Sequence, residues 1–160
     1  MFENNLKKFF LSLTIISVIF SFDRISKLYI LNLAEGEKYI DIYFNSFLNF
    51  NLIWNTGVGF GLFSSETNFY YNLITLLIVL INIIILIMAI KSQDYKLFFF
   101  LMILGGSFSN LFDRIYYQAV PDFIDMHYSD FHWFVFNVAD IFITLGVILL
   151  IYLEIFKKKI

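Results

Sequence analysis

The chain contains no cysteine and a single proline among its 160 residues, and few of them are charged. Without cysteine it can form no disulfide bond, thiolate nucleophile or Cys-ligated metal site. Charged residues make up only 15% of the chain and form no basic stripe, so we expect no nucleic-acid partner. Hydrophobic residues instead reach 60%, where soluble domains have about 45–50%. This composition is typical of a membrane protein.

Four segments are long and apolar enough to cross a membrane, because a span needs about 20 mostly apolar residues. They cover about 9–31, 69–90, 97–117 and 133–153. The first resembles a signal peptide, but SFDRISK follows it where a small-residue cleavage site would stand. We therefore interpret the first segment as an uncleaved anchor. The whole chain, 1–160, is expected to form a single integral membrane domain.

Lysines outside the spans predict how the chain crosses the membrane. With four spans, three groups of lysines fall on one side: Lys7 and Lys8, Lys91 and Lys96, and Lys157, Lys158 and Lys159. Short loops that carry Lys and Arg lie in the cytoplasm. The sequence therefore predicts that both termini are cytoplasmic, and that the loops after the first and third spans are extracytoplasmic.

The loop after the first span has the pattern of β-strands. YIDIYFN and FLNFNLIWN alternate apolar and polar residues, which is the strand period. Asn45-Ser46 is a plausible turn between them. We expect a small antiparallel sheet at about 36–63, with an irregular loop as the alternative. The predicted fold class is a membrane all-α bundle of four transmembrane helices with a small extracytoplasmic antiparallel β-sheet.

Charged and amide residues of the spans, with Asp122 of the short outer loop, gather at one depth near the outer interface. A charge at mid-bilayer costs about 2.5–3.5 kcal/mol even on insertion scales, so such residues mark a functional site by default. The residues are Asp23, Lys27, Asn110, Asp113, Arg114, Asp122, Asn137 and Asp140. Their common depth is the strongest indication of a site in the sequence.

Asp122 and Asp140 are the candidate catalytic pair. Asp122 lies in the short outer loop after the third span and Asp140 opens the fourth, so the two can face each other. Two carboxyl groups in contact share a proton, so one can activate water while the other protonates a leaving amine. Asn137, one helical turn before Asp140, can orient the site. An ion or proton pathway and a purely structural role remain open alternatives.

The other charged residues have structural interpretations as well as functional ones. Asp23 and Lys27 have the i,i+4 spacing of a helical ion pair and neutralise each other, although Lys27 can also contact a substrate carbonyl or lipid phosphate. Asp113 and Arg114 are sequence neighbours, so we expect them to bond to other elements. For Arg114 the alternative is an interfacial anchor that snorkels outward.

A metal site is a weaker possibility. Asp125, His127, Asp130 and His132 could ligate a metal, but no HExxH helix is present, and a polar loop face is the simpler interpretation. We predict no metal and no cofactor for the reaction.

Five blocks of sequence in this order resemble the lipoprotein signal peptidase (signal peptidase II) family. They are DRISK in the first span, NTGVGFG after the strands, GGSFSNLFDR in the third span, PDF after it, and FNVADIFITLG in the fourth. Their order, spacing and membrane depth all fit, and the blocks cover nearly the whole chain.

The resemblance implies a bacterial inner-membrane aspartyl endopeptidase, independent of metal, with an extracytoplasmic β-cradle. Such an enzyme cuts a prolipoprotein signal peptide before a diacylglyceryl-modified cysteine. The implied partners are this substrate and membrane lipid, with inhibition by globomycin-type cyclic peptides, and we expect a monomer. By resemblance Asp122 and Asp140 are catalytic, and the supporting positions are Asn55, Gly57, Asn110, Asp113, Arg114, Asn137, Asp23 and Lys27.

Three positions depart from the family pattern. Ser109 stands where a glycine is usual in the third-span block, and Gln118 and Pro121 stand in the stretch before Asp122 that usually reads Gly and then V-V-D-F. We expect tighter packing at Ser109 and a stiffer loop at Pro121. Because neither removes a catalytic atom, the expected effect is on substrate preference rather than activity.

Overall fold

The computed structural model describes residues 2–34, 40–57, 68–92, 95–129 and 131–156. Lys38, Asp130, Lys157, Lys158, Lys159 and all of the glycine-rich stretch after Gly57 lie outside the described residues. The elements in chain order are α1 Phe2–Leu33, β1 Asp41–Asn45, β2 Leu48–Asn55, α2 Asn68–Lys91, α3 Tyr95–Tyr117, β3 Val120–Tyr128, β4 Phe131–Phe136 and α4 Val138–Phe156. The predicted fold class, a four-helix membrane bundle with a small antiparallel sheet, is confirmed.

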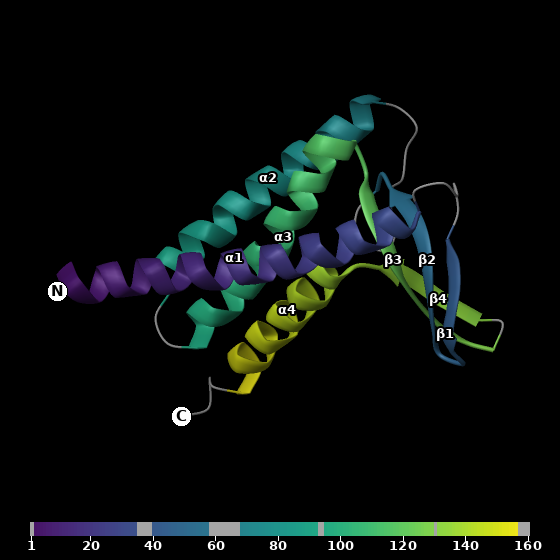
Figure 1. Cartoon of the computed structure of the whole chain (residues 1–160). Coiled ribbons are helices and arrows are strands. Elements are labelled where there is room, and N and C mark those ends of the chain that lie inside the picture. Colours follow the sequence, from purple (N-terminus) through teal and green to yellow (C-terminus); the bar gives the residue numbers. More distant parts are fainter. Residues whose placement is uncertain (1, 35–39, 58–67, 93–94, 130, 157–160) are drawn as a thin grey trace.

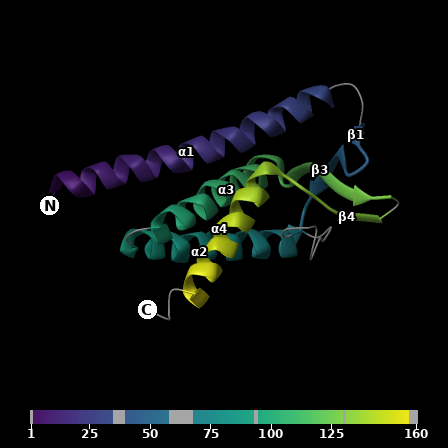
Figure 2. The same ribbon diagram turned by 90° about the horizontal axis from the view of Figure 1, so that it is seen from below.

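Helix α3 is the centre of the bundle. It lies between α1 and α2 (Figure 2), packs against α4 as well, and contains more buried residues than any other helix. The other helices point apolar side chains outward along their length, as lipid-facing helices do. Among the described residues, four helices are long and apolar enough to cross a membrane.

Two adjacent glycines let α3 approach two neighbours at once. A Cβ added at Gly105 would lie 2.8 Å from Cβ of Ile19 on α1. One added at Gly106 would lie 2.6 Å from the carbonyl oxygen of Ala139 at the start of α4. Small residues let helices pack closely, and this pair brings α1 and α4 against the middle of α3.

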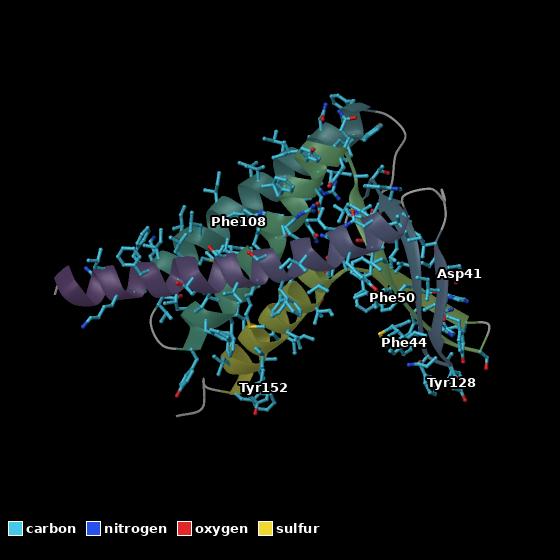
Figure 3. The ribbon with its side chains drawn as sticks, viewed as in Figure 1. Asp41, Phe44, Phe50, Phe108, Tyr128 and Tyr152 are labelled. Carbon is cyan, nitrogen blue, oxygen red and sulfur yellow. The ribbon has the colours of Figure 1, made fainter. Side chains whose placement is uncertain are left out.

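The sheet has four antiparallel strands in the order β1-β2-β3-β4. Figure 1 shows it at one end of the bundle, while α1 begins and α4 ends at the other. Ile30, Ile40 and Phe123 form a buried cluster that joins the end of α1 to the sheet, with Phe50 (labelled in Figure 3) packed against it. The sheet is thereby anchored to the helices.

The sheet extends beyond the segment that the alternation predicted. Residues 120–128 and 131–136 form β3 and β4, so Asp122 lies in a strand and not in the loop that was expected. The fourth helix begins at Val138, later than the expected start at 133, for the same reason. Residues 131–136 read FHWFVF, a run whose aromatic composition suits either a strand or an apolar span, and pairing with β3 selects the strand.

Helix α3 ends through Gln118, which has φ of 59°. A residue in the left-handed region just after a helix closes its last turn, and glycine usually occupies that position because it has no Cβ. Gln118 adopts this conformation without that advantage. The turn directs the chain into β3 and so places Asp122 beside the ends of the helices.

Candidate active site

A cavity of about 290 Å³ lies where α3, β3 and α4 meet. Its polar lining consists of Asn55, Ser107, Asn110, Arg114, Asp122, Asn137 and Asp140, and Ile78, Leu111, Val120 and Ile143 complete the wall. A larger crevice, of about 590 Å³, lies at the opposite end of the bundle, but no carboxylate lines it. The first cavity brings together both carboxylates singled out from the sequence, so it is the candidate site.

Strand pairing explains the surroundings of Asp122. Asn55 pairs with Val120 across β2 and β3, which places Asn55 diagonal to Asp122 on one face of the sheet. Its Nδ2 donates to Asp122 Oδ2 at 2.9 Å, and the N–H of Gly57 donates to its Oδ1 at 2.8 Å. The contact with Gly57 therefore fixes which way the Asn55 amide points.

Asp140 is held by the start of its own helix. Asn137 and Asp140 form a capping box: Asp140 N–H donates to Asn137 Oδ1, and Asn137 N–H donates to Asp140 Oδ2, both at 3.1 Å. Nδ2 of Asn110, on α3, donates to the other carboxylate oxygen at 2.9 Å. The polar residues at the mouth of an apolar helix are thus its N-terminal cap.

Asn137 also joins the two carboxylates. Its Nδ2 donates to Asp122 Oδ1 at 2.6 Å, while its backbone holds Asp140. Within the described contacts the two carboxylates make no direct hydrogen bond. Burial and, to a smaller extent, the charge of Asp140 raise the pKa of the Asp122 carboxyl from 3.8 to about 7, although the amides of Asn55 and Asn137 oppose the shift.

A cluster of buried charges lies behind the cavity. Nζ of Lys27 is 2.6 Å from Asp23 Oδ2 and 2.7 Å from Asp113 Oδ2, and Arg24 pairs with Asp113 Oδ1. The i,i+4 ion pair expected between Asp23 and Lys27 is therefore confirmed. Lys27, Asp23 and Asp113 have no exposed surface. Two cations balance two carboxylates, which is the condition for burying charge in a membrane bundle.

The charge cluster connects to the cavity through two contacts. Lys27 donates to Asn110 Oδ1 at 2.6 Å, and this fixes the Asn110 amide with its Nδ2 toward Asp140. Asp23 Oδ1 accepts from the N–H of Ala139 at 2.8 Å, in the first turn of α4. The cluster therefore ties α1, α3 and α4 together at the level of the site.

Arg114 lines the cavity instead of pointing outward, so the anchor alternative does not describe it. Its guanidinium lies 5.5 Å from the ring centroid of Tyr71, whose hydroxyl donates to the Arg114 carbonyl at 2.7 Å. Nη1 of Arg114 is buried and has no hydrogen-bond partner among the described residues. A cationic donor is therefore available beside the carboxylates.

Sequence reasoning left three residues out of the site. Arg24 neutralises Asp113, Tyr71 supports Arg114, and Ser109 Oγ donates to Asp23 Oδ2 at 2.7 Å. A third charge next to Asp23 in an apolar span is itself a signal, and it could have found Arg24. Ser109 was noted only as a departure from the family pattern, and nothing in the sequence around Tyr71 points to a role in the site.

The possible metal ligands are elsewhere. Asp125 and His127 lie on β3 and His132 on β4, and none of them lines the cavity. Asp130, the fourth residue of that group, is outside the described residues.

The chain is similar in sequence to proteins of a known family. A family profile described as "Signal peptidase (SPase) II" matches residues 15–156. A protein of Pelagibacter ubique (strain HTCC1062) named "Lipoprotein signal peptidase" is 59% identical over 152 residues, which cover 95% of this chain and 92% of that protein. A protein of the same name from Anaplasma phagocytophilum (strain HZ) is 36% identical over 158 residues, covering 96% and 97%.

The fold is also similar to solved structures. A structure described as a bacterial membrane enzyme superposes with a TM-score of 0.72 at 28% identity, covering 93% of this chain and 90% of that one. A second with the same description gives 0.69 at 29% identity, covering 89% and 90%. The likeness extends over nearly the whole chain.

Proposed function

We propose a specific reaction for this chain, which belongs to the lipoprotein signal peptidase (signal peptidase II) family, a family that removes signal peptides from prolipoproteins. The chain is an aspartic endopeptidase, and Asp122 and Asp140 are its catalytic pair. It cleaves the peptide bond before a cysteine that carries a diacylglyceryl group. The reaction uses no metal or other cofactor.

The joint hydrogen bonding of Asp122 and Asp140 carries this proposal. One residue, Asn137, bonds both carboxylates, and both line one cavity. Because the pKa of Asp122 is raised to about 7, the pair can hold one shared proton near neutral pH. An aspartic dyad needs this state: one carboxyl group that donates a proton and one carboxylate that accepts one.

The mechanism uses the proton that Asp122 and Asp140 share. A water molecule bound between the carboxyl groups gives a proton to the carboxylate, and its oxygen attacks the scissile carbonyl carbon. The carbonyl oxygen takes up the negative charge of the tetrahedral intermediate. The protonated carboxyl group gives its proton to the leaving nitrogen, and the C–N bond breaks. The products are the signal peptide with a free carboxyl group and the cysteine with a free amine.

Arg114 and Asn110 have supporting roles in this mechanism. Nη1 of Arg114 can donate to the substrate carbonyl oxygen, since it faces no protein partner among the described residues. A fixed cation near a developing oxyanion stabilises the transition state more than the ground state. Asn110 and Asn137 hold Asp140 in place, while Asn55, which Gly57 orients, holds Asp122.

An apolar groove beside Asp140 suits the lipid part of the substrate. It has a volume of about 250 Å³ and is lined by Met126, Phe134, Phe136, Asp140, Ile141, Thr144 and Leu145. It lies between the sheet and the outer surface of α4, so an acyl chain in the bilayer can enter it from the side. The lipid on the cysteine then contributes to recognition.

The positions of the lysines support one orientation of the chain in the membrane. Lys8 donates to the carbonyl of Ser92 at 2.7 Å, and Lys96 pairs with Glu154 at 2.7 Å, so the start of α1, the ends of α2 and α4 and the start of α3 meet at one end of the bundle. This end lies opposite the sheet (Figure 1). Under the positive-inside rule it faces the cytoplasm. The protein then lies in the bacterial inner membrane as a monomer, with both termini cytoplasmic and the active site near the extracytoplasmic face.

The test is cleavage of one synthetic prolipoprotein peptide prepared with and without diacylglyceryl on its cysteine. The purified chain in lipid nanodiscs should cut the lipidated peptide before the cysteine, as mass spectrometry of the products would show, and should cut the unlipidated one at least about tenfold more slowly, the effect of about 1.4 kcal/mol of lost binding. EDTA should leave the rate unchanged, and a globomycin-type cyclic peptide should block it. Equal cleavage of both peptides would contradict the proposed substrate.

A further inference from the structure

The chain has only two histidines, and the β3–β4 hairpin brings both of them together. His127 and His132 are paired directly across the strands, and their rings stack with centroids 5.1 Å apart. Asp125 lies two positions before His127, so the strand period places it on the same face of the sheet. One potential ligand atom from each of these three side chains lies within 4.8 Å of the others.

The polar atoms around these side chains are incompletely bonded. Asp125 is only 2% exposed, and its Oδ2 contacts His132 Nδ1 at 2.7 Å. Its Oδ1 is buried without a partner among the described residues, as is Nδ1 of His127. Asn49 lies opposite Asp125 across β2 and β3, and its buried Oδ1 also lacks a described partner. Buried polar atoms are normally paired, so three such atoms at adjacent positions indicate a place where an ion or polar ligand can bind.

We propose that Asp125, His127 and His132 bind one divalent transition-metal ion of the zinc class. Two imidazoles and a carboxylate are the donor set that zinc takes in open sites, with the remaining position filled by water or an amide oxygen. Asn49 is placed to supply that oxygen or to hold the water. The site is distinct from the catalytic cavity, and it does not depend on the proposed peptidase reaction.

The geometry requires a small adjustment around the ion. Ligand atoms at about 2.0–2.1 Å from a tetrahedral zinc lie about 3.3 Å from one another, and the potential ligand atoms of these three side chains lie within 4.8 Å of one another. The His132 side chain contacts Asp125 Oδ2 at 2.7 Å and is 54% exposed, so it can shift to admit the ion while Asp125 stays fixed in the sheet. Tyr128 (labelled in Figure 3) lies next to His127 in sequence and marks the end of this hairpin, away from the helices.

The expected consequence is a clamp on the sheet. The ion would link β3 to β4 near their connecting turn, on the strand that also carries Asp122. Because the chain has no cysteine and no other histidine, it offers no competing site made of these ligands. Tight zinc binding by the chain would therefore indicate binding at this hairpin.

The test is zinc binding by the metal-stripped, tag-free full chain in detergent, measured by equilibrium dialysis and repeated with Co²⁺ for its visible spectrum. The wild type should bind one ion per chain. His127→Gln, His132→Gln and Asp125→Asn should each weaken binding at least about tenfold, the lower end of the loss that even outer-shell changes cause. Asp41→Asn is the matched control, because it removes an exposed carboxylate from β1 of the same sheet.

Thermal unfolding gives a second readout that does not depend on catalysis. Zinc should raise the melting temperature of the wild type, of Asp41→Asn and of Asp122→Asn, but not of His132→Gln. The proposal is overturned if zinc binding is absent or unsaturable, or if the histidine variants bind zinc as the wild type does. Normal zinc binding by the catalytic variant would separate this site from the peptidase reaction.

Discussion

The side-chain amide of Asn137 donates to Asp122 at 2.6 Å, which links the first residue before α4 to the first part of β3. The same amide group accepts from Asp140 N–H through its oxygen. It cannot turn over without breaking both bonds. Asn137 therefore sets the position of a strand residue relative to a helix residue, and the proposed dyad depends on this residue.

Two substitutions at Asn137 separate its two roles. Asn137→Ala removes the helix cap and the bond to Asp122, so we expect a loss of about 1–2 kcal/mol of stability together with most of the activity. Serine also caps helices but is too short to reach Asp122. Asn137→Ser should therefore remain stable and still lose activity, as unfolding in detergent and the cleavage assay would measure. Wild-type activity in the serine variant would remove Asn137 from the site.

The raised pKa of Asp122 predicts how activity depends on pH. Because this pKa is about 7, the shared proton is lost as the pH rises through that value. The plot of kcat/KM should fall on the alkaline side with a midpoint near pH 7, a value that belongs to the carboxyl pair. A rate that stays constant from pH 6 to pH 9 would contradict a dyad with one proton.

The same pKa predicts how stability depends on pH. The unfolded chain loses the Asp122 proton near pH 3.8 and the folded chain near pH 7, so the folded state binds more protons between these values. The free energy of unfolding should therefore fall with rising pH, by up to about 4 kcal/mol from this group. In Asp122→Asn this decline should be absent. Equal pH slopes in the variant and the wild type would contradict the shift.

The buried charge cluster predicts a large loss of stability when one of its charges is removed. Lys27→Met leaves Asp23 and Asp113 without their common cation and frees the Asn110 amide. Breaking a buried pair in this way costs about 3–5 kcal/mol. Lys96→Met is the control, because its ion pair with Glu154 is exposed at the other end of the bundle. The two variants should differ clearly in resistance to denaturant, and equal resistance would argue against a structural role for the cluster.

The contact of α3 with α4 gives a steric prediction. Gly106→Ala would place a methyl group 2.6 Å from the carbonyl oxygen of Ala139, which is backbone and cannot turn aside. We expect a loss of about 1–3 kcal/mol, with reduced activity because the start of α4 carries Asp140. Ile148→Ala, on the exposed face of α4, should change stability much less. Unchanged cleavage by Gly106→Ala would show that the helices adjust.

Much of the fold could be predicted from local patterns. The four spans follow from composition, and the alternation of residues 41–55 gave two of the strands. The strand at residues 131–136 could not be predicted, because its apolar run has no period that separates a strand from a span. Asp122 was expected in the loop after the third span, whereas cross-strand pairing with β2 holds Pro121 and Asp122 in a strand.

The site could be predicted as a set of residues but not as a network. Common membrane depth gathered Asp23, Lys27, Asn110, Asp122 and Asp140, and family resemblance supplied the catalytic roles. The partners of each side chain are set by helix packing, so the bridge through Asn137 and the link from Lys27 to Asn110 had no signal in the sequence. Gln118 was visible only as a departure from glycine, and its φ of 59° gives the reason.

The most direct test of the central claim is the cleavage rate of Asp122→Asn and of Asp140→Asn on a diacylated prolipoprotein. Each substitution keeps the size of the side chain but removes the ability to exchange a proton with water. With Asp41→Asn as the control for losing an exposed carboxylate, each catalytic variant should lose at least about 10³-fold in kcat, within the range of general acid–base catalysis, while remaining folded. Cleavage by either variant at close to the wild-type rate would contradict the assignment of Asp122 and Asp140 as the catalytic pair.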